Sequence, residues 1–279
     1  MKFRKSIISN SKQDIACSLF LFFIIPTVFY YEIQHVLAEI HGYNYILYTH
    51  LILGCYLVFN IVVNLMHIIL IDTSVFSTNE LMTTSRFKTD PTAKDWNLCD
   101  KCELIVPPRS WHCDVCNVCI LKRDHHCMFA GNCVGLNNNR YFMIFLLHFF
   151  IGATYSFFYN SYYIWIYRGT SFIAWFTPFK MFFPMFMMFF RSNNDWHLFL
   201  YMLIMIGSIF TGVLLVYHMK LIVKNATTHE KNKGAYDLGT AQNLKIVFGD
   251  RWLWSIFWPF AESTLPEVYW NPAESQKSR

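Results

Sequence analysis

The chain has 279 residues, of which 54% are apolar and only 15% are charged, and its formal net charge is +5. This composition is too apolar for an ordinary soluble domain of the same length. The net charge is small and no basic stripe is interleaved with aromatic residues, so we expect no nucleic-acid partner. The length suffices for a few membrane spans and one small domain.

Four long apolar segments are predicted to cross a membrane as helices. They cover residues 15–31, 46–71, 141–166 and 197–223. A helix needs about 20 apolar residues to span a bilayer, a length that the last three segments reach. The first segment is shorter and contains Pro26, but Tyr30 and Tyr31 at its end are typical of a membrane–water interface. Residues 32–45 are interpreted as the loop to the second helix.

The distribution of charge predicts the orientation of these spans. With four spans, both termini and the segment between the second and third spans share one side of the membrane. Residues 1–14 contain four Lys or Arg, residues 220–279 contain eight, and residues 32–45 contain none. The positive-inside rule therefore predicts that both termini and the 72–140 segment are cytosolic.

We expect four parts along the chain. They are an amino-terminal segment with the first two helices (1–71), a cytosolic cysteine-rich domain (72–140), the third and fourth helices with a lumenal connection (141–223), and a cytosolic tail (224–279). A fifth apolar stretch, 172–190, is interrupted by two prolines and a lysine and is interpreted as re-entrant or interfacial. We find no internal repeat, and Asp90-Pro91 is predicted to form a turn.

Ten cysteines and histidines are concentrated between residues 99 and 133. They are Cys99, Cys102, His112, Cys113, Cys116, Cys119, His125, His126, Cys127 and Cys133. The repeated spacing of two cysteines separated by two residues favours metal over disulfides, and therefore a reducing compartment. A structural zinc takes four ligands, so two zincs use eight of the ten groups. Histidines among the thiols favour zinc, and a Rieske-type iron–sulfur cluster is the alternative.

Two groups are left over, and His125 and Cys127 are the pair best suited to chemistry. In an extended backbone these two side chains point to one face and His126 to the other. His125 can then act as the base for a Cys127 nucleophile, while Asp124 orients the imidazole. The alternative is a third metal or redundant ligands. The third apolar segment begins at Tyr141, which predicts that the thiol lies near the membrane–water boundary.

The Asp-His-His-Cys sequence at 124–127, inside this cysteine-rich frame, resembles the DHHC-type protein S-acyltransferases, or palmitoyltransferases. The Thr-Thr-His-Glu sequence at 227–230 resembles the family's Thr-Thr-x-Glu motif and is also a capping box. Residues 236–239 and 243–249 resemble the family's C-terminal segment. We therefore expect an all-α integral membrane protein that has four transmembrane helices and a small cytosolic two-zinc cysteine-rich domain of short strands and loops.

The resemblance implies a role for each metal-binding and reactive residue. One zinc is held by Cys99, Cys102, His112 and Cys119, and the other is held by Cys113, Cys116, His126 and Cys133. Cys127 is the acylated nucleophile, His125 is its base and Asp124 is the orienting acid. Four basic residues near the reactive segment are candidates to hold the phosphates of CoA, and contact with anionic lipid headgroups is the alternative. They are Arg109, Lys122, Arg123 and Arg140.

The implied reaction has two steps. Cys127 takes a long acyl group, such as palmitate, from acyl-CoA, which makes the enzyme itself a transient lipoprotein. It then passes that group to a cysteine of a protein substrate at the cytosolic face, for example a juxtamembrane cysteine. The resemblance also implies residence in the membrane of the Golgi or the endoplasmic reticulum.

Three departures from the family pattern keep other functions open. Met128-Phe129 stands where the family usually has Pro-Trp, Thr92 follows Asp90-Pro91 where Gly is usual, and Gly131 replaces the first Asn of the common Asn-Asn-Cys sequence. A membrane-anchored zinc module that binds partners, including a ubiquitin-ligase-like one, is the first alternative. A catalytically silent relative that keeps the fold is the second.

Overall fold

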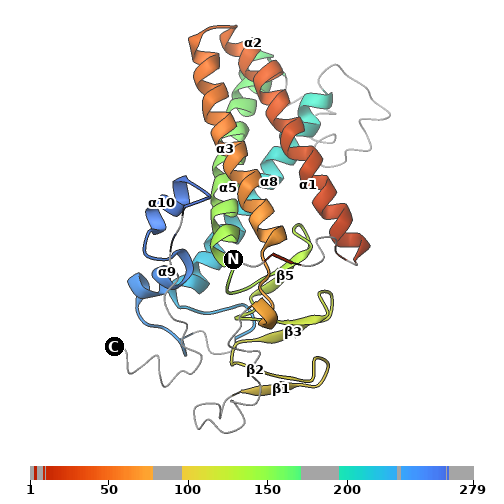
Figure 1. Cartoon of the computed structure of the whole chain (residues 1–279). Coiled ribbons are helices and arrows are strands. Elements are labelled where there is room, and N and C mark those ends of the chain that lie inside the picture. The colour runs from red at the N-terminus through yellow and green to blue at the C-terminus, as the bar shows by residue number, and fades with distance from the viewer. Residues whose placement is uncertain are drawn as a thin grey trace. The chain divides into compact units, whose positions relative to one another are not determined.

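The fold is described from a computed structural model, shown in Figure 1, in which residues 3–4, 9, 11–77, 96–170, 195–230, 234–261 and 263 are described. The expected turn at Asp90-Pro91 and the apolar stretch 172–190 lie outside these residues. The chain divides into two compact units. The first contains Met1–Leu21, Val62–Phe145 and Val216–Arg279, and the second contains Phe22–Ile61 and Leu146–Leu215.

Among the described residues, four helical spans are long and apolar enough to cross a membrane. The first consists of α1 (Lys12–Tyr31), a wider π-helical turn η1 (Glu32–Leu37) and α2 (Ala38–His41). The others are α3 (Tyr45–Leu70), α5 (Asn139–Tyr162) with its π-helical end η5 (Tyr163–Tyr167), and α8 (Asp195–Val223). Together with the strands of the cysteine-rich region, these helices confirm the expected fold class.

The interpretation of 32–45 as a loop is wrong for residues 32–41, which continue the first helix. This stretch has no Gly or Pro and is rich in residues that tolerate a helix. The helix ends at Gly42, where φ is 69° and the N–H donates to the carbonyl of Ala38 at 2.9 Å. Asn44 then caps α3, because its side-chain oxygen accepts the N–H of Ile46 at 2.9 Å.

The second unit has an aromatic and aliphatic core of its own. Tyr31, Tyr163, Leu198 and Leu200 are buried together, and partly buried side chains surround them. A polar pair also lies inside this unit, where the Asn160 amide donates to the buried Glu32 carboxylate. Buried polar groups within a span are expected to find partners inside the helix bundle.

The first unit contains three short antiparallel hairpins, which follow one another in Figure 1. The first hairpin pairs β1 (Asn97–Cys99) with β2 (Leu104–Val106). The second pairs β3 (Trp111–Cys113) with β4 (Val118–Ile120). The third pairs β5 (His125–Cys127) with β6 (Asn132–Val134). A 3₁₀ turn, η2 (Val75–Ser77), contacts β4.

The three hairpins are copies of one 14-residue unit, so the expectation of no internal repeat is wrong. Their first strands begin at 97, 111 and 125, and in each the third residue is a cysteine that pairs with the first residue of the returning strand. The same turn position has a positive φ in all three, at Glu103, Asn117 and Gly131, with values of 54°, 52° and 55°. No position other than this cysteine carries the same residue in all three units, so the repeat is inconspicuous in the sequence.

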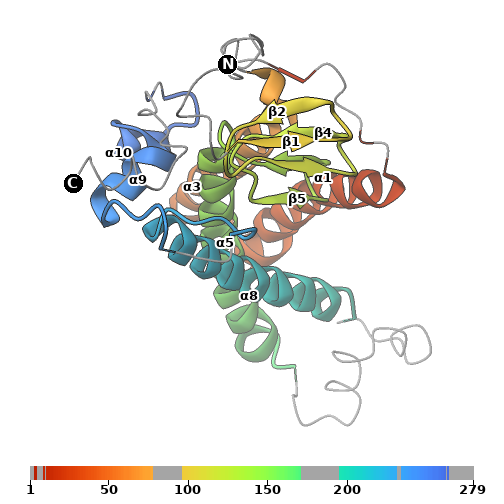
Figure 2. The same cartoon turned by 90° about the horizontal axis from the view of Figure 1, so that it is seen from below.

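Two asparagines hold the ends of helices in the first unit. The Asn132 amide donates to the carbonyl of Ile68 at 2.8 Å, in the last turn of α3. The fully buried Asn243 donates to the carbonyl of Val223 at 2.6 Å, at the end of α8. Asn243 lies on α9 (Thr240–Phe248), which is followed by α10 (Trp252–Phe257), and Figure 2 shows these two helices side by side. These bonds satisfy carbonyls that a helix leaves open at its end.

Candidate active site and metal centres

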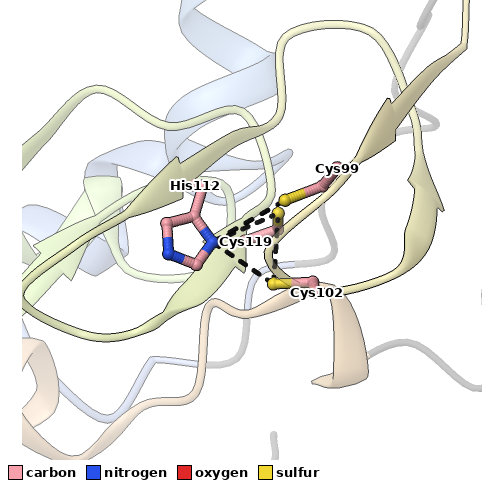
Figure 3. A group of neighbouring side chains, drawn as sticks. All are labelled: Cys99, Cys102, His112 and Cys119. Atoms are coloured by element: carbon pink, nitrogen blue, oxygen red, sulfur yellow. Dashed lines mark hydrogen bonds between the residues drawn. The ribbon is translucent and has the colours of Figure 1, made fainter.

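A first donor group is formed by Cys99, Cys102, His112 and Cys119. Figure 3 shows the three sulfurs converging on Nδ1 of His112. The distances from this nitrogen to the sulfurs of Cys102, Cys99 and Cys119 are 3.2, 3.7 and 4.0 Å. The sulfurs of Cys102 and Cys119 lie 3.7 Å apart. The first two hairpins supply all four side chains.

A second donor group has the same composition, with Cys113, Cys116, His126 and Cys133. Nδ1 of His126 lies 3.6, 3.4 and 3.7 Å from the sulfurs of Cys113, Cys116 and Cys133. The sulfurs of Cys116 and Cys133 lie 3.7 Å apart. The second and third hairpins supply these four side chains. The structure thus brings together the eight residues in the same two sets that the family resemblance implies.

Both groups fit a tetrahedral zinc ion. All ligand atoms within each group lie within 4.8 Å of one another. The sulfur–sulfur separation of 3.7 Å matches the edge of about 3.8 Å that follows from a zinc–sulfur bond of about 2.3 Å. Three thiols and one imidazole form a closed set, which is typical of structural zinc and leaves no open position for a substrate. Two Cys/His sites able to bind zinc are therefore present.

Strand geometry explains how neighbouring residues serve different metals. His112 and Cys113 are adjacent on β3, yet His112 belongs to the first group and Cys113 to the second. Successive side chains of a strand point to opposite faces, so the second hairpin contributes ligands to both groups. The same alternation in β5 places His125 and Cys127 on one face and His126 on the other, as the sequence predicted.

The reactive segment lies beside the second group. Nδ1 of His125 lies 2.7 Å from Oδ2 of Asp124, and His125 also forms a hydrogen bond with Cys127. The other carboxylate oxygen of Asp124 accepts the N–H of Thr228 at 3.0 Å, and the Thr228 hydroxyl donates to the Asp124 carbonyl. Cys127 is partly exposed and belongs to neither four-donor group. The structure therefore brings together the three residues expected to act in the reaction.

The surroundings of Asp124 and His125 shift both of their pKa values. Burial disfavours the charged form of His125, but the hydrogen bonds with Asp124 and Cys127 outweigh it and raise the pKa of His125 to about 9. Burial also disfavours the Asp124 carboxylate, but the bond with His125 and the N–H of Thr228 hold the pKa of Asp124 below its usual range. Asp124 is therefore an anion that orients and stabilises a protonated His125.

His218 is a site residue that the sequence analysis missed. It is buried in the last turns of α8, and its Nδ1 lies 3.4 Å from Oδ2 of Asp124. Its ring centroid is 5.1 Å from that of His125. The ring centroid of Phe142 lies 5.0 Å from the centroids of both imidazoles. A histidine inside an apolar span is the signal that could have revealed it, because ionisable residues in spans are usually functional.

The four basic candidates for CoA binding are engaged within the protein. Arg109 is buried, where its Nε donates to Glu230 at 2.5 Å, and its guanidinium lies 4.0 Å from the ring centroid of Tyr236. Burial and the charge of Arg109 hold the pKa of Lys122 well below its usual range, and Lys122 donates to Asn225 at 2.8 Å. These bonds hold the 225–230 segment, in which Glu230 also accepts the N–H of Thr227 at 3.0 Å, one of the two bonds of the predicted capping box.

The other two candidates differ in exposure. Arg140 is buried and donates to the Tyr141 hydroxyl at 2.5 Å. Arg123 is less buried than the other three basic residues and lies 2.7 Å from Nε2 of His229. CoA binding by these four residues stays a prediction, and Arg123 is the one with the most accessible side chain.

The fold and the site together define a class of protein. It is a multi-span membrane protein whose two closed Cys/His metal sites support a separate cysteine beside an Asp-paired histidine. Comparison with known proteins is in accord with this class. The family model for the DHHC palmitoyltransferases matches residues 92–235, and the chain belongs to this family.

Three relatives illustrate the similarity. The probable palmitoyltransferase ZDHHC24 of Mus musculus is 31% identical over 184 residues, which cover 61% of this chain and 62% of the relative. The palmitoyltransferase ZDHHC20 of Homo sapiens is 33% identical over 187 residues, which cover 61% of this chain and 46% of the relative. ZDHHC2 of Homo sapiens is 33% identical over 178 residues, covering 57% and 42%. The match thus spans less than two thirds of each of these relatives.

Proposed function

We propose that this protein is a protein S-acyltransferase that moves a long-chain acyl group, such as palmitate, from acyl-CoA to cysteine thiols of proteins. Cys127 carries the acyl group between the two steps. Both termini and the metal domain face the cytosol in this proposal, which follows from the distribution of Lys and Arg. Golgi or endoplasmic reticulum membranes are the proposed location.

One observation carries the proposal. Eight of the ten clustered Cys and His side chains form two closed four-donor groups, and Cys127 is the cysteine of this cluster that neither group uses. It adjoins His125, whose imidazole is already paired with the buried carboxylate of Asp124 at 2.7 Å. A thiol, a base and an orienting carboxylate in this order are the parts of a nucleophilic acyl transfer.

The first step forms a thioester on the enzyme. The imidazolium of His125 holds the proton of the Cys127 thiol, and the Cys127 thiolate attacks the carbonyl carbon of acyl-CoA. The bond between that carbon and the CoA sulfur breaks, and the leaving CoA thiolate takes the proton back from His125. Asp124 stabilises the imidazolium until this transfer takes place.

The second step returns the enzyme to its starting state. The thiol of a substrate cysteine gives its proton to His125 and attacks the thioester carbonyl on Cys127. Cys127 leaves as a thiolate, and the proton stays on the imidazolium of His125 beside it. Splitting the transfer in this way lets one nucleophile serve many protein substrates, because the donor and the acceptor need not be bound together. Bound zinc supplies structural support to the hairpins and takes no part in either step.

Acyl labelling tests this function. Purified full-length protein is incubated with alkynyl palmitoyl-CoA, and the label is then challenged with hydroxylamine, which cleaves thioesters. We expect labile label on the wild type and none on Cys127→Ser. Cys55→Ser is the matched control, since Cys55 is an exposed cysteine on α3, and it should be labelled like the wild type.

Two further measurements separate the competing functions. Transfer of the label to a membrane-anchored peptide with a juxtamembrane cysteine distinguishes an active enzyme from a silent relative. Asp124, His125 and His218 also place three donor atoms within 4.8 Å of one another, so the third-metal alternative is tested by the metal content. Two zincs per chain support the enzyme, whereas three zincs together with equal label on Cys127→Ser support a metal-binding module.

A further inference from the structure

We propose that Asp14, in the first turn of the first membrane helix, is a positioning residue for the second metal and fastens this helix to the hairpin that carries Cys127. Oδ2 of Asp14 lies 2.9 Å from Nε2 of His126. The opposite ring nitrogen, Nδ1, faces the three sulfurs of the second donor group. Asp14 is thus aligned with the imidazole on the side away from the metal site.

The arrangement matches a known way of tuning a metal ligand. A histidine that ligates through one ring nitrogen usually donates its other N–H to a carboxylate or carbonyl, which fixes the tautomer and raises the basicity of the ligand. Asp14 is buried, at 4% exposure, so water does not screen this bond strongly. The first group lacks such a partner among the described residues: Nε2 of His112 accepts or donates no hydrogen bond, and the exposed Asp114 lies 3.8 Å from it.

The local sequence holds the carboxylate in place. The Ser9 hydroxyl donates to Oδ2 of Asp14 at 2.5 Å, and the N–H of Asp14 donates to the Ser11 hydroxyl at 3.4 Å. Ser11 and Asp14 stand in the positions of a helix cap and its partner three residues later, where a carboxylate is also favoured by the helix dipole. These local bonds therefore orient the Asp14 carboxylate independently of its bond with His126.

The same amino-terminal segment also forms hydrogen bonds with the turn that follows Cys127. The Ser18 hydroxyl donates to the carbonyl of Phe129 at 3.0 Å, and the Arg4 guanidinium donates to the carbonyl of Gly131 at 2.9 Å. A Cβ on Gly131 would lie 3.2 Å from Cβ of Ser9, so glycine permits this close approach. Phe129 and Gly131 are two of the positions at which the sequence departs from the family pattern.

The contacts lead to one consequence for the reaction. His126 and Cys127 are neighbours on β5, so a bond that fixes His126 also fixes the backbone that carries the nucleophile. Asp14 touches neither Cys127 nor His125 in the described contacts, and it acts only through His126 and the metal site. The effect on catalysis rests on the proposed function, whereas the effect on zinc retention does not.

Zinc retention under a chelator tests the proposal directly. Full-length wild type, Asp14→Asn and the control Asp114→Asn are loaded with two zincs and challenged with excess EDTA. Thiols that become free are alkylated at intervals and identified by peptide mass spectrometry. In Asp14→Asn we expect Cys113, Cys116 and Cys133 to react about ten- to a hundredfold sooner, the usual effect of removing such a partner. The cysteines of the first group should keep their wild-type rate.

The control sets the meaning of each result. Asp114→Asn makes the same change beside the other histidine, where no hydrogen bond to the imidazole is lost, and should leave both groups at the wild-type rate. Wild-type release from Asp14→Asn, or earlier release from the first group instead, overturns the proposal. If Asp14→Asn does not fold, Ser9→Ala removes one donor to the same carboxylate and should give a smaller acceleration confined to the second group. No acceleration in Ser9→Ala would then overturn the proposal.

A kinetic readout separates positioning from a general loss of structure. At saturating acyl-CoA, self-acylation of zinc-loaded Asp14→Asn should be slower than in the wild type, with the half-saturating acyl-CoA concentration unchanged. A weaker affinity for acyl-CoA with an unchanged maximal rate would contradict the positioning role. If the wild type itself forms no thioester, the proposed function fails, while the zinc-retention result still decides the role of Asp14.

Discussion

The third hairpin differs from the first two in the fate of its leading cysteine. Cys99, Cys113 and Cys127 occupy the same position in the 14-residue unit, as the third residue of the first strand. Cys99 and Cys113 belong to donor groups, whereas Cys127 does not. The candidate nucleophile therefore has the same backbone position as two metal donors but no metal site of its own. The backbone alone does not determine whether a cysteine at this position binds metal or stays free to react.

The difference follows from what surrounds each cysteine. Every donor group combines two cysteines of one hairpin with a histidine and a cysteine of the next hairpin. The third hairpin has neither the second cysteine nor a following hairpin. Ala130 stands where the first two hairpins have Cys102 and Cys116, and β6 is followed by the helix α5, which supplies no histidine and cysteine pair. Cys127 instead has His125 as its neighbour, and Asp124 and His218 contact His125. A metal site and a reactive site can thus share one local fold and differ only in their partners.

The largest expected effect comes from breaking the group next to Cys127. Cys133→Ala should lose one zinc and all thioester label, because His126, the neighbour of Cys127 on β5, loses its metal. Structural zinc contributes about 10–16 kcal/mol to the folding of small zinc domains. Cys99→Ala should also lose one zinc but keep a measurable part of the label. Zinc content and acyl labelling are measured in parallel, and equal loss of label in both variants would contradict the separate roles of the two groups.

Restoring the missing knuckle cysteine should turn the third hairpin into a metal binder. Ala130→Cys recreates the spacing of Cys113 and Cys116, so added zinc or cadmium should capture the Cys127 thiolate and slow self-acylation by about tenfold or more under reducing conditions. Mild chelation should restore the rate. Ala130→Ser is the matched control and should be insensitive to added metal. An Ala130→Cys variant that is equally insensitive would show that the hairpins are not equivalent.

A smaller effect is expected at the shared turn position. Gly131→Ala places a side chain at a φ of 55° and brings its Cβ to 3.2 Å from Cβ of Ser9. The backbone conformation alone costs about 1–2 kcal/mol for a residue other than glycine. Asn117→Gly makes the opposite change in the second hairpin, at a φ of 52°, and should not destabilise the protein through backbone strain. Thermal unfolding checks both variants, and an unchanged Tm for Gly131→Ala would refute this account.

The smallest effect is expected on the surface of the first group. Lys101 and Asp114 form an ion pair across the first two hairpins, with side-chain exposures of 64% and 79%. Exposed pairs contribute little, because water and salt screen them. Lys101→Gln should therefore leave zinc retention, Tm and acyl labelling at their wild-type values. A clear loss of zinc from this variant would mean that zinc binding by the first group depends on the exposed ion pair of Lys101 and Asp114.

Much of the fold was predictable because membrane spans and metal knuckles have strong local signals. The length and apolarity of the four spans, and the spacing of Cys99 with Cys102 and of Cys113 with Cys116, were sufficient for the fold class. The length of the first helix was predicted wrongly. Residues 32–41 are more polar than a span, so hydropathy did not reveal that the helix continues to Gly42, although its residues tolerate helix well.

The site shows the same limit. Strand alternation predicted that His125 and Cys127 share one face, and Asp124 was assigned by analogy with the carboxylate of a catalytic triad. The partners of Asp14 and His218 could not be predicted, because each partner is about a hundred residues away in sequence and no motif connects them. The four basic residues were grouped by proximity in sequence, and only the structure revealed that Arg109 and Lys122 are bound to the 225–230 segment.

The sequence by itself determined the chemical inventory: four apolar spans and ten clustered Cys and His side chains, two more than two zincs use, since these depend on composition and short spacings. The tertiary structure decided which neighbours each donor has. It revealed the 14-residue repeat, the carboxylate behind His126 and the second imidazole beside Asp124. Contacts of this kind depend on how distant segments pack, and local physical rules do not encode which distant side chain will complete a site.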